Sequence, residues 1–493
     1  TATFRVASWD DENDHEYRIS YASRGAKRQA VTATFGGTIR RDPRARPKTV
    51  VAAFTGNNDL GFPHADVVKH VATFQPDLLI FTGDQIYEPV GGFGVQRAPL
   101  DMAALDYLRK WFMYGWEYRE LLRNVPSVAM PDDHDVYHGN LWGAGGRDAN
   151  DIVPALQREG VGVQTQKQDS GGFTMPVEWV NMVQRTQTSH LPDPVDPAPA
   201  ERGIGVYFTE LVWGGVSYAI IEDRKWKSAP AVMLPEAQIV NGWARNPDRD
   251  SSEHGDVAGA ELLGARQMRF LERWAGSRSP EIWMKAFVSQ TIFVNVATLP
   301  RGSRADDITT KLPIQPPGGY APGEAPVQDH DSNGWPQSPR LAALRLMKKA
   351  GAVHISGDQH LGMTIQYGID TFRDGPFAIC VPSVANFWPR RWFPDAEGAN
   401  REPGAPRNTG DYLDGFGNKM TVLAVSNPFK HGVEPVDIND RAPGYGIITF
   451  DRAGRTITFA NWPRWVDPAA PGAKPYPGWP ITIRKPPDGG DAR

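Results

Sequence analysis

The chain of 493 residues contains a single cysteine, Cys380. One thiol cannot form an intrachain disulfide, and zinc sites built on paired cysteines are excluded with it. No run of eighteen apolar residues occurs, so the sequence predicts no membrane-spanning helix. The formal net charge is only −4, from 53 basic and 57 acidic residues, which provides no cationic field for nucleic acid or an anionic membrane. The Gly-x-Ser-x-Gly elbow, the His-Glu-x-x-His motif and the Walker loop are absent, which disfavours covalent serine catalysis and these zinc and nucleotide sites.

Acidic and histidine residues instead follow apolar segments at three places. Asp84 ends the segment DLLIFTGD, the residues at 132–135 (DDHD) follow VPSVAM, and Asp358 with His360 follows AVHISG. The apolar segments are typical of buried strands in an α/β sheet, where ligands lie beyond the carboxyl ends of the strands. Each acid alone is as easily a turn residue or helix cap, and each histidine a structural one. Three clusters in the same context favour a metal centre, with two cations rather than one to balance the gathered charge.

The distribution of element signals predicts one large α/β domain with additions at both ends. Residues 1–48 alternate in character and predict a small accessory β segment. Residues 49–464 alternate strand and helix patterns, as in βαβ units, and include 205–223 as one long central strand. Residues 465–493 form a Pro-rich tail that we expect to wrap the surface. The 50 glycines and 43 prolines exceed the usual share of about 12%, which predicts long ordered loops around the pocket.

The three clusters resemble the motifs of a known family. Residues 83–87 (GDQIY), 132–135 (DDHD) and 357–360 (GDQH) are similar to the motifs of the PhoD-like metallophosphatases, also called the alkaline phosphatase D family, within the calcineurin-like metallophosphoesterase superfamily. Residues 222–224 (EDR) resemble the acidic-x-Arg segment of that family, and the similarity spans about residues 49 to 460. The resemblance implies a four-layer α/β/β/α sandwich with a binuclear or larger metal centre.

The resemblance also implies a set of metal ligands. Asp84 would bridge two ions, with Asp84, Tyr87 and His360 on the first and Asp84, Asp133 and Asp358 on the second. Carboxylates and a phenolate are hard oxygen ligands, and imidazole adds a preference for transition metals. Fe(III) with Ca(II) is therefore the expected pair, with Mn(II), Mg(II) and Zn(II) as alternatives.

Two further roles concern the histidine of the second motif and its neighbour. The resemblance implies that His134 protonates the leaving group, a role suited to a cationic imidazole. Asp135 either orients that imidazole or is an exposed acid of the same loop.

Substrate contacts are less specific in the sequence. Where many relatives carry a cysteine ligand, this chain has Asn57 and Asn58, which either bind a metal and a phosphate, respectively, or are turn residues. Arg224 offers a planar fork for a phosphate, with a surface salt bridge as the alternative. Residues 386–393 (NFWPRRWF) either stack the organic group of a substrate or use arginines to fix a long loop.

Together these features predict metal-dependent hydrolysis of small phosphate esters, monoesters, diesters or both, by a metal-bound hydroxide. Two alternatives remain open: a non-catalytic calcium- or carbohydrate-binding protein that uses the 16 tryptophans, and a sulfate-ester or phosphonate hydrolase on the same centre. A His134 that points away from the acids would favour the binding protein. The resemblance implies a secreted or periplasmic protein. A first residue of Thr1 is consistent with a removed leader or a trimmed chain, and no signal peptide is visible to decide between them. The oligomeric state is not indicated.

Overall fold

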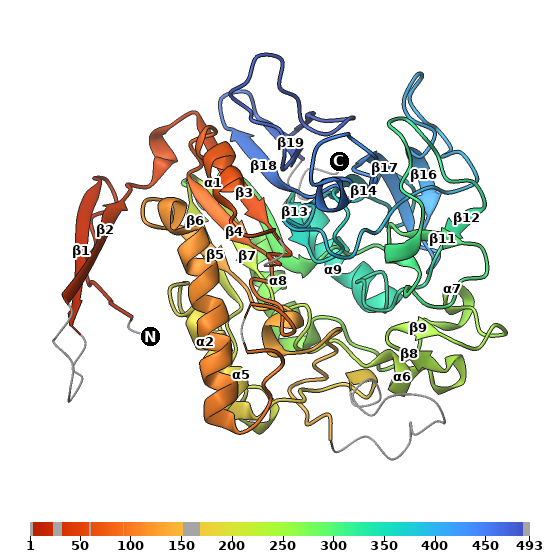
Figure 1. The fold of residues 1–493 in the computed structure, drawn as a ribbon, viewed down its shortest axis with the longest axis horizontal. Coiled ribbons are helices and arrows are strands. Elements are labelled where there is room, and N and C mark those ends of the chain that lie inside the picture. The colour runs from red at the N-terminus through yellow and green to blue at the C-terminus, as the bar shows by residue number, and fades with distance from the viewer. Residues whose placement is uncertain (1–2, 23–31, 59–60, 92, 151–167, 487–493) are drawn as a thin grey trace.

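Two mixed β-sheets form the centre of the molecule (Figure 1). The structure, a computed structural model, describes residues 3–22, 32–58, 61–91, 93–150 and 168–486. The six-stranded sheet has the order β20-β19-β18-β3-β4-β5 and the eight-stranded sheet the order β16-β17-β14-β15-β13-β10-β7-β6. The first sheet comprises β3 (Lys48–Phe54), β4 (Leu78–Phe81), β5 (Ser127–Ala129), β18 (Gly444–Asp451), β19 (Thr456–Pro463) and β20 (Ile481–Arg484). The second comprises β6 (Thr209–Trp213), β7 (Val216–Ile220), β10 (Met284–Thr291), β13 (Val353–Gly357), β14 (Met363–Tyr367), β15 (Phe377–Cys380), β16 (Gly410–Leu413) and β17 (Lys419–Val425).

The two sheets pack face to face, and this explains why their central strands are apolar throughout. Successive side chains of a strand point to opposite faces of the sheet. In β4, Ile80 belongs to the core between the sheets, where Val288 and Ile355 of the other sheet also lie, whereas Leu79 and Phe81 belong to the core under the outer helices. A strand buried on both faces therefore needs a continuous apolar run, as its sequence LLIF provides.

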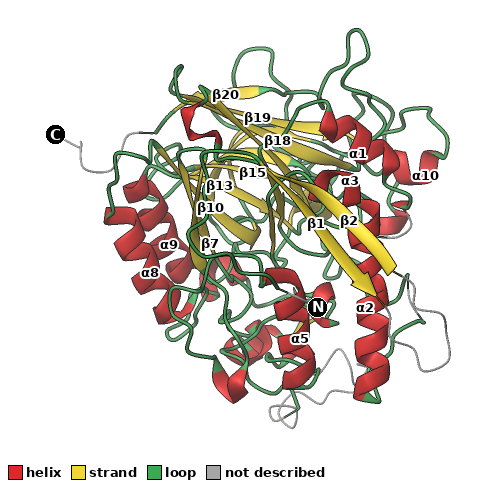
Figure 2. Ribbon diagram, turned by 90° about the vertical axis from the view of Figure 1, so that its left-hand side faces the viewer, coloured by secondary structure: helices red, strands yellow, loops and turns green. Residues whose placement is uncertain are grey.

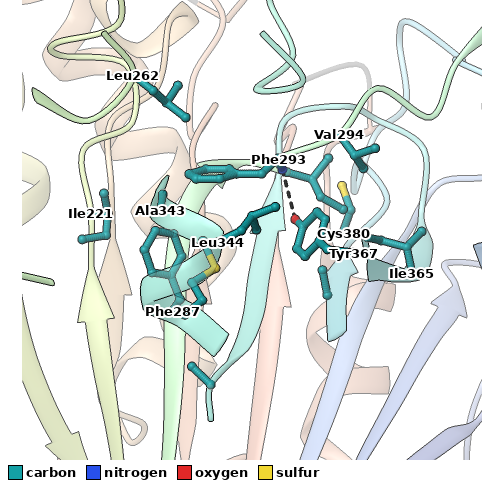
Figure 3. Packing of buried hydrophobic residues seen from close by; sticks show 14 of the residues in the cluster. Ile221, Leu262, Phe287, Phe293, Val294, Ala343, Leu344, Ile365, Tyr367 and Cys380 are labelled. Carbon is teal, nitrogen blue, oxygen red and sulfur yellow. Dashed lines mark hydrogen bonds between the residues drawn. The ribbon is translucent and has the colours of Figure 1, made fainter. Parts of the chain in front are cut away.

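Helices cover the outer face of each sheet, as Figure 2 shows. Helices α1 (Ala65–Ala72), α2 (Leu100–Glu117) and α3 (Arg119–Leu122) share a core with the six-stranded sheet. Helices α8 (Gly264–Gly276) and α9 (Gln337–Ala350) share another with the eight-stranded sheet. In that core Phe287 of β10 lies near Ala343 and Leu344 of α9, and the Phe293 amide donates a hydrogen bond to the Tyr367 hydroxyl at 3.1 Å (Figure 3). The expected α/β class is confirmed.

Smaller elements lie around this centre. Strands β1 (His15–Ala22) and β2 (Thr32–Ile39) form an antiparallel hairpin that stands away from the two sheets (Figure 1). The Pro-rich tail contributes the edge strand β20, which pairs with β19. The remaining elements are α5 (Val177–Thr188), α6 (Pro230–Met233), α7 (Ser251–His254), α10 (Val436–Asn439), β8 (Ile239–Val240), β9 (Trp243–Ala244), β11 (Thr298–Pro300), β12 (Glu324–Pro326) and the short 3₁₀ helices η1 (Pro43–Ala45), η3 (His134–Val136), η5 (Glu201–Gly203), η6 (Pro235–Ala237) and η7 (Thr309–Lys311). The domain boundaries at residues 48 and 465 stay predictions.

The long central strand expected over 205–223 is wrong in its connectivity. The structure has two antiparallel strands there, β6 and β7, paired as a hairpin. Gly214 and Gly215 form the turn with φ angles of 63° and 72°. Two successive residues at positive φ build the tight turn that suits the twist of a hairpin, and glycine adopts this conformation without steric cost.

In the part of the chain that the structure describes, no helix combines the length and the apolar character needed to cross a membrane.

Candidate metal centre

The three acidic loops meet at one end of the two sheets, although not as neighbours in a single sheet. The loops with Asp84 and Asp133 follow β4 and β5, which are parallel neighbours in the six-stranded sheet. The loop with Asp358 follows β13 of the eight-stranded sheet. The three apolar segments, expected as strands of an α/β sheet, therefore belong to two sheets rather than one. Thr55, at the end of β3, links the sheets: it bridges to Ser383, and its hydroxyl accepts a hydrogen bond from the Asp358 amide at 3.1 Å.

The backbone of the acidic loops is strained where the ligands stand. Asp84, Asp358 and His360 have φ angles of 55°, 65° and 60°. Side-chain-bearing residues rarely adopt this left-handed region, and when they do the surrounding structure must hold them there. Gly83 precedes Asp84 with a φ of 135°, and a Cβ at this position would lie 2.4 Å from the Cβ of Asp132. Glycine is thus required for the close approach of the first two acidic loops.

Asp84, Tyr87 and His360 form the first group of candidate ligands. The Tyr87 hydroxyl lies 3.0 Å from Asp84 Oδ2 and 3.4 Å from His360 Nε2. On the other side of the ring, His360 Nδ1 lies 3.1 Å from the carbonyl oxygen of Trp388. A proton on Nδ1 that is donated to this carbonyl leaves the lone pair of Nε2 directed at Asp84 and Tyr87, which is the arrangement of a metal-binding imidazole.

A second group contains an acid to which the family resemblance gave no role as a ligand. Ligand atoms of Asp84, Asp133 and His134 lie within 4.8 Å of one another, and so do those of Asp132, Asp133 and Asp358. Asp84 Oδ1 and Asp132 Oδ2 are buried and have no hydrogen-bond partner among the described residues. Buried carboxylate oxygens without a partner are costly, and a bound cation is the partner that fits them. Asp132 stands in the predicted acidic cluster, but the family resemblance pointed to its neighbour Asp133.

The electrostatics of these acids agree with a cation site. Burial, reinforced by the nearby carboxylates, raises the pKa of Asp84 well above its usual value. Burial and the charge of Asp84 likewise raise the pKa of Asp133. For Asp358, burial acts in the opposite direction to the cationic neighbours Arg224 and Arg390, which prevail and lower its pKa. Two of the candidate ligands therefore need positive charge nearby to stay ionised, and metal ions supply it.

Arg224 contacts these acids directly. Its side chain is 2% exposed. Nε lies 2.7 Å from Asp132, Nη1 2.6 Å from Asp331 and Nη2 2.6 Å from Asp358. Asp331 lies between β12 and α9, a segment in which the sequence analysis identified no site residue. The surface salt bridge considered for Arg224 is excluded because the residue is buried, and its contact with a phosphate stays a prediction.

His134 is paired with a glutamate that the sequence reasoning missed. Its Nδ1 lies 2.7 Å from Glu88 Oε2, and its ring centre 4.4 Å from that of Tyr87. Burial acts to lower the pKa of His134, but the carboxylates of Glu88, Asp133 and Asp84 outweigh it and raise this pKa well above its usual value. The imidazole is 24% exposed, so part of the ring is open to solvent. The available signal was the position of Glu88, directly after Tyr87.

Neither role expected for Asp135 is found. Its carboxylate is buried and accepts hydrogen bonds from the backbone amides of Asp84 at 2.9 Å and Asp132 at 2.9 Å. Burial raises its pKa to about 6 despite these hydrogen bonds. Asp135 therefore ties the first two acidic loops together, and the orientation of His134 is left to Glu88.

The two asparagines after β3 are buried beside the same loops. The backbone N–H of Asn57 donates a hydrogen bond to the backbone carbonyl of Asp84 at 2.8 Å. Asn57 Oδ1 accepts a hydrogen bond from Tyr118 at 2.5 Å. Asn58 is 3% exposed. The first contact places Asn57 beside the Asp84 loop, and the roles of both asparagines toward metal and phosphate stay predictions.

Comparisons with known proteins give one family and several similar solved structures. The profile of a family described as PhoD-like phosphatase matches residues 52–384. No protein of the curated collection matches the chain. A solved structure of PhoD aligns with a TM-score of 0.55 at 15% identity, over 96% of this chain and 76% of the other. A purple acid phosphatase from yellow lupin (Lupinus luteus) seeds aligns with a TM-score of 0.42 at 10% identity, over 95% and 59% of the two chains. A dimetal phosphatase from Danio rerio aligns with a TM-score of 0.41 at 7% identity, over 89% and 99%.

Proposed function

The chain belongs to the PhoD-like phosphatase family, and from this premise we propose that its acidic centre hydrolyses phosphate esters with two or more bound metal ions. The observation that supports the proposal most is the convergence of Asp84, Tyr87 and His360, with 3.0 and 3.4 Å between their polar atoms. The unpartnered buried oxygen of Asp84 in the described structure adds to it. A role for these residues without a bound cation would leave that oxygen unexplained.

The residues present fit a pair of cations. Asp84, Tyr87 and His360 would hold one ion, and Asp84, Asp133 and Asp358 the second. Fe(III) and Ca(II) suit the phenolate and carboxylate oxygens, with Mn(II), Mg(II) and Zn(II) as alternatives. When bound, such cations polarise a phosphoryl oxygen and activate water as the nucleophile. Asn57 would add an amide oxygen if it exchanged its contact with Tyr118.

His134 is the proposed proton donor to the leaving alcohol. It stands with Asp84 and Asp133 within 4.8 Å, on the same side as the acids. This orientation favours an enzyme over a protein that merely holds structural ions, which has no use for a cationic imidazole there. Glu88 holds the Nδ1 side of the ring, so that Nε2 is the atom that can carry the transferred proton.

Asn58 and Arg224 are the two residues that the sequence offers as phosphate contacts. Asn58 would donate an amide hydrogen bond to a phosphoryl oxygen. For Arg224 the contacts favour a supporting role, in which the guanidinium steadies the acids around it, over direct contact with the phosphate. We extend the proposal to both monoesters and diesters, and to export from the cytoplasm, which the family resemblance alone supports.

The test compares p-nitrophenyl phosphate with bis(p-nitrophenyl) phosphate, before and after chelation and with iron, calcium or manganese restored. Turnover that a chelator abolishes and a metal restores is the expected result, and the rate ratio assigns ester preference. Asp84→Asn should abolish turnover. Asp370→Asn, which changes an exposed acid paired with Arg345, should leave turnover unchanged. Absence of turnover on both esters with every metal would refute the proposal, and faster hydrolysis of p-nitrophenyl sulfate would replace it with a sulfatase.

A further inference from the structure

Residues 386–393 (NFWPRRWF) follow β15 and lie against the third acidic loop. Both arginines of this segment face inward. Arg390 lies 2.7 Å from Asp329 and also donates to the side chain of Gln359. Arg391 pairs with Glu324, and its guanidinium carbon lies 5.7 Å from the ring centre of Phe393. For this half of the segment, arginines that fix a long loop are the correct interpretation.

The first half of the segment presents its rings differently. The Phe387 side chain is 43% exposed, and Trp388 is partly exposed beside it. Their ring centres lie 6.3 Å apart with an interplanar angle of 41°. One exposed aromatic residue on a surface needs no explanation, so exposure alone does not identify a site. The site is indicated instead by the hydrogen bonds that join this segment to His360, a candidate metal ligand.

Hydrogen bonds hold the segment that carries this aromatic pair to His360 at two points, the Trp388 backbone and the Asn386 side chain. The Trp388 carbonyl faces His360 Nδ1 at 3.1 Å. The buried Asn386 donates from Nδ2 to the His360 carbonyl at 3.2 Å. Arg441 donates to the Phe387 carbonyl at 3.2 Å, and Trp388 Nε1 donates to Asp306 at 3.2 Å. The pair is thus fixed to a residue whose other nitrogen points at Asp84 and Tyr87, and binding there requires little further ordering.

We propose that Phe387 and Trp388 form a subsite for a flat ring in the organic part of the ester, as in nucleoside or aryl phosphates. The inference rests on the proposed function, because it places the phosphoryl group at the acids and the organic group at the rim where the two rings lie. A planar ring stacks on an aromatic side chain through apolar contact and the π systems, with little demand for a particular hydrogen-bond pattern. The subsite therefore selects the class of leaving group rather than one compound.

The test uses two esters that release the same type of alcohol. Adenosine 5′-phosphate and ribose 5-phosphate both break a bond to a primary 5′ oxygen, and they differ in the base. The metal-loaded full chain should prefer the nucleotide in kcat/KM by about 5- to 150-fold, the range for stacking of one base. In Phe387→Ala this ratio should fall toward one, mainly through KM.

Two further variants separate stacking from other effects. Phe387→Leu keeps apolar bulk without a π system and should retain part of the preference. Phe112→Ala removes a more exposed aromatic ring on α2, 65% exposed, and should leave the ratio at the wild-type value. A ratio that is the same in wild type and Phe387→Ala overturns the subsite. A wild type that hydrolyses neither ester leaves the two p-nitrophenyl esters to decide the proposed function. In that second case calorimetric titration with adenosine decides the subsite by itself: equal binding to wild type and Phe387→Ala, or none, overturns it.

Discussion

Replacement of Arg224 by glutamine distinguishes a residue that steadies buried acids from one that binds substrate. The guanidinium is 2% exposed and contacts Asp132, Asp331 and Asp358 at 2.6–2.7 Å. Its removal leaves these buried carboxylates without their cationic partner, and breaking a buried ion pair in this way costs about 3–5 kcal/mol. Arg345→Gln is the matched control. Its ion pair with Asp370 has side chains 57% and 71% exposed, and an exposed pair contributes at most about 1 kcal/mol.

The assay is urea unfolding of the chelated proteins, followed by circular dichroism. We expect Arg224→Gln to lose at least three times as much unfolding free energy as Arg345→Gln. Addition of metal should restore part of the loss, because bound cations compensate the same carboxylates and stabilise only the folded state. The reasoning fails if Arg224→Gln is no less stable than the control while its KM for a phosphate ester rises tenfold or more. That outcome would assign Arg224 to the substrate, as the sequence suggested.

Three more predictions concern the proton donor, the core and the first acidic loop. Glu88→Gln removes the carboxylate that raises the pKa of His134, so the alkaline limb of the kcat profile should move to lower pH; an unchanged limb would contradict the pairing. Burial lowers the pKa of His354 from 6.5 to about 3, so its unfolded form binds the proton first and stability falls as the pH drops below about 6.5. The loss should reach about 4 kcal/mol near pH 3.5, and His354→Gln should flatten this part of the stability curve measured by urea unfolding; an equally steep curve would argue against it. Gly83→Ala places a Cβ 2.4 Å from a carbon of the next acidic loop at a φ of 135° and should reduce bound metal measured by mass spectrometry, whereas Gly115→Ala, with open space around its Cβ, should retain it.

The sequence by itself determined the central strands and the residues that end them. Continuous apolar runs such as Leu78–Phe81 are the local signature of strands buried on both faces, and β4 has these bounds. The order of the acidic motifs after such strands identified the PhoD-like phosphatase family, which the family match confirms. The sequence could not show that Asp84 and Asp358 come from different sheets, because local apolar patterns do not encode which strands pair.

Only the tertiary structure decided which partner each polar side chain has. Arg224 meets Asp331 and Asp358 across 107 and 134 positions of the chain. His134 meets Glu88, 46 positions away, rather than its own neighbour Asp135. Local propensity and periodicity describe a few turns of helix or one strand, whereas hydrogen bonds and ion pairs depend on distances between segments brought together by packing of the core. The sequence therefore determined which ligand and acid–base groups are available at the centre. The tertiary structure determined the contacts through which each residue is proposed to act.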